Sequence, residues 1–128
     1  MKKIISILIV LGVFYGLFQL LSQAPSNTQV PDDQTDMIFF WGEGCPHCEN
    51  VKDYITEKKL NDRLKINQKE VYYKQQNKNQ MLSFAQKCNI DTTNGIGVPF
   101  AYFNSDSSCL VGDQPIIDKL DQILSTKQ

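Results

Sequence analysis

Two cysteines separated by two residues, in the order Cys45-Pro46-His47-Cys48, follow an apolar run and precede a stretch with helical periodicity. The apolar run, Met37–Trp41, has the character of a strand that is covered on both faces. Pro46 suits the first turn of a helix, where its missing N–H is not needed. A helix N-terminus stabilises a thiolate, so this placement predicts reversible thiol–disulfide exchange with Cys45 as the attacking sulfur.

Each residue of the motif has an expected role in that exchange. We expect Cys45 at the N-cap position and partly exposed, and Cys48 one turn further on, more buried and acting as the resolving thiol. His47 adds a hydrogen-bond donor or a positive charge near Cys45. Stabilising the thiolate stabilises the dithiol and makes the disulfide more oxidising. Pro46 and His47 therefore favour a reduction potential in the oxidising half of the range known for such pairs, about −270 to about −120 mV.

Metal chemistry is the alternative interpretation of the motif. Haem attachment is excluded because Glu49, and not a histidine, follows Cys48. Zinc needs further ligands, and the other two cysteines of the chain do not form a second CxxC. A metal-binding or metal-delivery module that uses Cys45, Cys48 and His47 stays open, although no metal is expected.

The N-terminal segment predicts a location outside the cytoplasm. After Lys2 and Lys3, residues 4–22 are mostly apolar, and the stretch 4–21 would span roughly 27 Å as a helix. We expect an uncleaved membrane anchor over residues 1–22. A signal peptide cleaved after Ala24 is the alternative, and Pro25 opposes that cleavage. In both cases the lysines stay in the cytoplasm and the domain lies in the periplasm or at the cell surface, or is secreted after cleavage.

The remaining chain divides into a polar linker and one domain. Residues 23–36 contain two prolines and no aromatic residue, which indicates a flexible linker. Residues 37–128 are enough for a single small domain. The chain carries 13 basic and 14 acidic side chains, so no nucleic-acid partner is expected.

Local patterns in the domain predict the order β-α-β-α-β-β-α. A helix begins at Pro46 and runs to about Lys59, and a last helix begins at Pro115. The expected segments between them are a strand over Leu64–Tyr73, a helix over Lys78–Cys88, and strands over Val98–Phe103 and Ser108–Gly112.

This order, with a CxxC opening a helix after an aromatic strand and a proline opening a later strand, resembles the thioredoxin-like superfamily in its minimal, glutaredoxin-sized form. The resemblance covers Met37 to about Leu124 and implies an α/β fold with a central four-stranded mixed sheet flanked by helices. The CPHC tetrad is similar to the active site of periplasmic disulfide oxidases of the DsbA type. The chain has no room for the helical domain of those enzymes.

The resemblance also implies roles for residues outside the tetrad. It implies a cis peptide bond between Val98 and Pro99, with the backbone of Val98 pairing with an extended substrate segment. A proline at the first residue of a strand is also tolerated without such a role. Trp41 is a substrate-binding candidate, and plain core packing is its alternative. Where the family has a buried acid, this chain has Phe39, which leaves Glu43 or water to move the proton of the resolving thiol.

Cys88 and Cys109 complete an even number of cysteines, which permits a second disulfide in an oxidising compartment. Two other interpretations stay open. Cys88 can be a small apolar residue of a helix face, or the two thiols can relay electrons to or from Cys45 and Cys48.

Together these features predict a membrane-anchored, extracytoplasmic thiol–disulfide oxidoreductase that acts as an oxidant and needs no cofactor. Its expected partners are substrate protein thiols or disulfides and a membrane redox partner, either a quinone-linked oxidase or a transmembrane electron carrier. A tethered reductase, for example in cytochrome c maturation, is the alternative.

Overall fold

The computed structural model describes residues 12–15, which are helical, and residues 30–126. Most of the expected anchor, 1–22, and most of the expected linker, 23–36, lie outside these residues. Within the described ranges, no helix has both the length and the apolar character needed to cross a bilayer.

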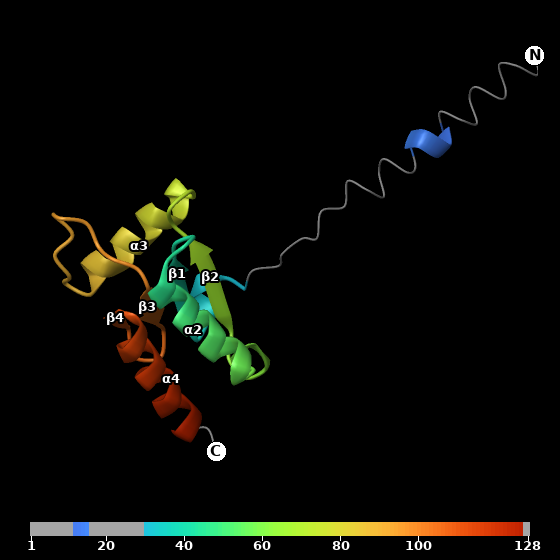
Figure 1. Cartoon of the computed structure of the whole chain (residues 1–128). Helices are drawn as coiled ribbons and strands as arrows, with labels where there is room; N and C mark the ends of the chain where they lie inside the picture. The colour runs from blue at the N-terminus through green and yellow to red at the C-terminus, as the bar shows by residue number, and fades with distance from the viewer. Residues whose placement is uncertain (1–11, 16–29, 127–128) are drawn as a thin grey trace, which may run out of the picture.

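From residue 30 onward, the strands and helices follow the predicted order β-α-β-α-β-β-α, which is confirmed (Figure 1). The two short 3₁₀ turns are η1 (Asp32–Gln34) and η2 (Leu60–Asp62). The strands and helices are β1 (Met37–Trp41), α2 (Pro46–Glu57), β2 (Ile66–Glu70), α3 (Gln75–Lys87), β3 (Phe100–Phe103), β4 (Ser108–Val111) and α4 (Asp113–Thr126).

The four strands form one mixed sheet in the order β2-β1-β3-β4. β1 is parallel to β2 and antiparallel to β3, while β3 and β4 form an antiparallel pair. In this register Phe39 lies between Gln68 and Ala101. β1 is a central strand, and helices cover its side chains on both faces of the sheet, as its continuous apolar sequence predicts.

Each face of the sheet has its own core. Met37 and Phe39 of β1 pack with buried residues of α2 and α4 on one face, while Ile38 and Phe40 pack with Met81 and Ala85 of α3 on the other. Alternate residues of a strand point to opposite faces, so one five-residue strand serves both cores. The chain is therefore an α/β protein with a four-stranded mixed sheet and helices on both faces.

Several predicted boundaries are wrong. β3 begins at Phe100, so Val98 and Pro99 precede the strand that was expected to start at Val98. β2 covers Ile66–Glu70 and not Leu64–Tyr73; it ends at Glu70 because the Glu70 carboxylate accepts hydrogen bonds from the backbone N–H groups of the next turn. α3 begins at Gln75, three residues before the expected Lys78. α4 begins at Asp113, which places Pro115 inside the first turn and not at its start.

The C-terminal part of the expected linker is folded onto the domain. Asp32 accepts hydrogen bonds from Asn67 and Lys69, both at 2.7 Å, and from Gln80. Burial raises the pKa of Asp32, but these donors outweigh it and hold that pKa below its ordinary value. Asn104 adds a hydrogen bond to the Asp32 carbonyl. This network lies near the start of β1, so the chain enters the domain at the opposite end of that strand from Cys45.

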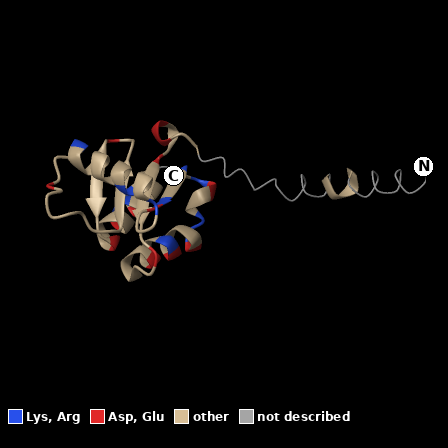
Figure 2. Cartoon of the chain, turned by 90° about the horizontal axis from the view of Figure 1, so that it is seen from above, with Lys and Arg blue, Asp and Glu red and all other residues tan. Residues whose placement is uncertain are grey.

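Charged side chains are mixed over the surface of the described domain. Figure 2 shows acidic and basic residues interspersed along the helices. This distribution agrees with the nearly balanced composition of the chain.

Candidate active site

Cys45 and Cys48 form a disulfide at the start of α2, with their Cα atoms 5.2 Å apart. Cys45 is the N-cap residue and Pro46 occupies the first turn, as predicted. The backbone N–H of Cys48 donates to Cys45 Sγ at 3.2 Å. Gly44, with a φ of 71°, supplies the left-handed backbone that turns the chain from β1 into this helix. The helix N-terminus is therefore directed at the sulfur expected to carry negative charge.

The two sulfurs differ in their access to solvent. Cys45 is 8% exposed and Cys48 is 0% exposed. The prediction that Cys45 is more exposed than Cys48 is confirmed. Cys45 is nevertheless less exposed than expected, because its Sγ lies 3.8 Å from the Val98 carbonyl oxygen. An incoming thiolate thus meets Cys45 first and meets it next to the backbone of Val98.

Val98 and Pro99 lie directly beside this disulfide. The peptide bond between them is cis, as predicted. The ladder of β3 begins at Phe100, so Val98 precedes the paired strand. The Gly112 N–H donates to the Pro99 carbonyl at 2.9 Å, which fastens the start of α4 to this segment. The structure therefore brings together three segments that are far apart in sequence: the CxxC, the Val98–Pro99 pair and the start of α4.

Trp41 lies at the end of β1, partly buried against the core cluster that contains Cys45 and Cys48. Lys52 Nζ stands 3.2 Å from the centroid of the indole ring and also pairs with Glu49 at 3.0 Å. A cation over the indole face is a stabilising contact. Trp41 thus packs beside the site with one face covered by a lysine, so core packing accounts for its position.

Phe39 is fully buried in the same core cluster as Cys48. Over the described ranges, the buried polar residues are Thr35 and Asn67, which belong to the opposite end of β1. Among the described residues, therefore, no buried carboxylate lies beside Cys48. Glu43 is exposed on the loop before Cys45.

Glu70 and Tyr72 shape the surroundings of the site and were not nominated from the sequence. Although desolvation raises the pKa of Glu70, backbone N–H groups of Tyr73, Tyr72, Lys74 and Glu43 lower it below its ordinary value. This one carboxylate joins the loop before Cys45 to the turn after β2. The Tyr72 ring lies over Gly42, where a Cβ atom would be 2.3 Å from the ring. The glycine allows the aromatic ring to lie against the loop.

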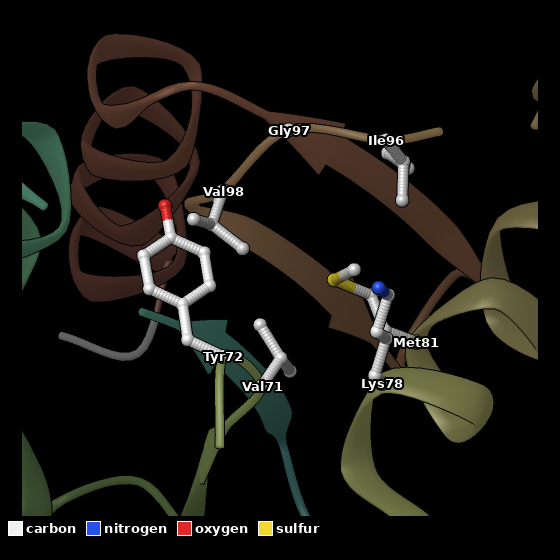
Figure 3. Close-up of a pocket in the computed structure, with 7 residues that line it drawn as sticks. All are labelled: Val71, Tyr72, Lys78, Met81, Ile96, Gly97 and Val98. Carbon is white, nitrogen blue, oxygen red and sulfur yellow. The ribbon is translucent and has the colours of Figure 1, made fainter. Parts of the chain in front are cut away.

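A hollow of about 290 Å³ opens beside Val98. Figure 3 shows Tyr72 and Val98 on one side of it and Met81 and Lys78 of α3 on the other. Val71, Ile96 and Gly97 complete the lining. The lining of this hollow is partly polar and partly apolar, and the hollow borders the disulfide through Val98, whose carbonyl oxygen lies 3.8 Å from Cys45 Sγ.

His47 is exposed on the first turn of α2, with 70% of its side chain accessible. Its Nδ1 lies 3.0 Å from Asp113 Oδ2, and Asn50 Nδ2 lies 2.6 Å from the same oxygen. Asp113 was not nominated from the sequence. The only sequence signal for it is an acidic residue just before Pro115, at the start of a predicted helix.

Cys88 and Cys109 form a second disulfide, one of the arrangements that the sequence left open, with Cα atoms 6.1 Å apart. Cys88 caps the C-terminus of α3 and Cys109 lies in β4. The bond therefore joins the helix that covers one face of the sheet to the edge strand.

Removing this second disulfide should destabilise the domain without affecting the first. The bond closes a loop with a sequence separation of 21 residues. A disulfide that restricts the unfolded chain over such a loop contributes about 3 kcal/mol to the free energy of unfolding. In the variant Cys88→Ala/Cys109→Ala, urea unfolding should show a free energy of unfolding lower by that amount. The rate of disulfide exchange at Cys45 should stay the same. A fall in that rate with little loss of stability would support the electron-relay interpretation instead.

No group of three or more His, Cys, Asp or Glu residues within residues 12–15 and 30–126 is arranged to hold a metal ion. Comparisons of the chain with protein-family models, with curated proteins and with solved structures give no match.

Proposed function

We propose that this chain is a thiol–disulfide oxidoreductase of thioredoxin-like fold, which oxidises the thiols of substrate proteins with its Cys45–Cys48 disulfide. The observation that carries the proposal is the placement of that disulfide at the N-terminus of α2, where Cys45 Sγ accepts the N–H of Cys48. A helix N-terminus stabilises the thiolate that forms when the bond opens.

The reaction has two steps and transfers two electrons from two substrate thiols to the disulfide. Of the two protons that the substrate thiols release, one goes to Cys48 and the other to solvent or a neighbouring base. A substrate thiolate attacks Cys45 Sγ, the Cys45–Cys48 bond breaks, and Cys48 leaves and takes a proton. A second substrate thiolate then attacks the substrate sulfur of the mixed disulfide. Cys45 leaves as a thiolate facing the helix N-terminus, and the substrate departs as a disulfide. The 8% exposure of Cys45 and the complete burial of Cys48 support attack at Cys45.

The surroundings of Val98 suit an extended substrate segment. Its backbone precedes the β3 ladder and lies beside Cys45 Sγ. A segment that pairs with Val98 would bring its cysteine to Cys45 and a neighbouring side chain to the hollow that Tyr72, Met81 and Val98 line. These features support a protein substrate more than a small thiol.

The remaining parts of the proposal follow from the apolar N-terminal segment. Residues 1–22 would anchor the chain in the cell membrane with the domain outside the cytoplasm. A quinone-linked membrane oxidase would then reoxidise the dithiol. A transmembrane electron carrier would take that place if the protein worked as a reductase.

The direct test is oxidation of a peptide that carries two cysteines by the oxidised full-length chain. We expect the peptide thiols to disappear with formation of one peptide disulfide per Cys45–Cys48 disulfide consumed. The rate should exceed that of glutathione disulfide at the same concentration. A chain that leaves the peptide thiols unchanged, while Cys45 and Cys48 stay oxidised, would refute the proposed function.

A further inference from the structure

The starts of α2 and α4 are joined by three side chains: His47, Asn50 and Asp113. Asp113 Oδ2 accepts from Asn50 Nδ2 at 2.6 Å and lies 3.0 Å from His47 Nδ1. The Asp113 side chain is 25% exposed, against 70% for His47. A residue at the start of the last helix thus holds the imidazole of His47, which lies between the two cysteines in the sequence.

The charge of Asp113 determines which way this hydrogen bond runs. The hydrogen bond with His47 and then that with Asn50 lower the pKa of Asp113 to about 2. Asp113 is therefore a carboxylate at neutral pH and can only accept, so His47 Nδ1 carries the donated hydrogen. In the neutral ring the other nitrogen, Nε2, then carries no hydrogen.

The acid is itself held in place relative to the disulfide. Gly112, next to it in the chain, donates its N–H to the Pro99 carbonyl at 2.9 Å. The neighbouring Val98 carbonyl lies 3.8 Å from Cys45 Sγ. The start of α4 is thus fastened to the same segment that borders the attacking sulfur.

We propose that Asp113 is a positioning residue: it fixes the orientation and tautomer of the His47 ring and thereby stabilises the reduced form of the Cys45–Cys48 pair. A carboxylate that accepts from Nδ1 of an imidazole keeps the hydrogen there, leaves Nε2 able to take up a proton released by a substrate thiol, and stabilises the imidazolium formed in that step. The ring that has taken up this proton then stabilises the Cys45 thiolate produced by reduction with two substrate thiols. The inference rests on the proposed function, because it concerns the potential of the exchanging pair.

Acting directly on Cys45, the negative charge of Asp113 would have the opposite effect and would destabilise the reduced pair. A carboxylate near Cys45 disfavours a thiolate, so its removal would make the disulfide more oxidising. Two donors already compensate this carboxylate, which weakens its field at the sulfur. The sign of the change on neutralising Asp113, and its dependence on His47, therefore distinguish action through the imidazole from direct repulsion.

Neutralising Asp113 in the full chain should make Cys45–Cys48 a weaker oxidant. For Asp113→Asn we expect the equilibrium constant for oxidation of glutathione to fall about threefold, as for loss of a partly exposed charge-assisted hydrogen bond. A threefold change corresponds to about 15 mV for a two-electron couple. In a His47→Ala background the same substitution should cause no further change. The matched control is Asp118→Asn, which removes an exposed acid bonded to Gln114 on the same helix and should leave the constant unchanged.

A measurement on the unmodified chain is independent of how the variants fold. His47 is the chain's one histidine, so its ring nitrogens give unambiguous ¹⁵N NMR signals. We expect the neutral ring to carry its hydrogen on Nδ1. A hydrogen on Nε2, a rise of the equilibrium constant in Asp113→Asn, or a change that persists without His47 would each overturn the inference. The proposed function would survive these outcomes, and it fails separately if the unmodified chain does not exchange with glutathione at all.

Discussion

Replacing Cys45 by serine should reduce disulfide exchange to the uncatalysed background, a loss of about a thousandfold or more. Serine can keep the N-cap hydrogen bond by accepting from the Cys48 N–H, but it has no sulfur and cannot form a disulfide. The remaining thiol, Cys48, is completely buried and cannot reach a substrate. The measurement is the rate of oxidation of a two-cysteine peptide by the preoxidised chain.

The matched control for Cys45→Ser is Cys88→Ala/Cys109→Ala, which also removes a disulfide but leaves α2 unchanged. That control should keep its activity. If Cys45→Ser stayed active while the control lost its activity, the attacking sulfur would belong to the second disulfide and the proposed site would be wrong.

Replacing Cys48 by serine should convert the protein into a covalent trap for its substrates. The reduced variant still has the Cys45 thiolate at the helix N-terminus, which attacks a substrate disulfide and releases one substrate thiol. No second thiol follows to resolve the mixed disulfide, so this species should accumulate from undetectable amounts to the major product. Mass spectrometry of the chain after reaction with a disulfide-bonded peptide measures it.

The position of the trapped peptide is part of the same expectation. The adduct should be on Cys45 and should disappear on treatment with dithiothreitol. If Cys48→Ser formed no adduct while Cys45→Ser did, the roles of the two sulfurs would be reversed.

Local patterns in the sequence were enough to predict the parts of the fold that depend on a few neighbouring residues. The continuous apolar sequence of Met37–Trp41 predicts a central strand, and the structure covers it on both faces. Pro46 after Cys45 predicts the start of α2 because proline is tolerated only in the first turn of a helix. The even number of cysteines permitted the second disulfide, though not its choice over two free thiols.

Features that depend on distant partners could not be predicted in this way. β2 ends at Glu70 because that side chain accepts three backbone N–H groups of the following turn, while the apolar pattern continues through Val71. The role of Asp113 depends on His47, which is 66 residues away in sequence. Local periodicity gives no information on either contact.

The most direct test of the central claim is the reduction potential of the Cys45–Cys48 pair in the full chain. The chain is equilibrated with glutathione buffers of graded potential, its thiols are blocked, and the two disulfides are resolved by peptide mass spectrometry. We expect Cys45–Cys48 to open reversibly between about −270 and about −120 mV, in the oxidising half of that range. A potential below about −300 mV, typical of structural disulfides, would contradict the claim that this pair exchanges with substrates.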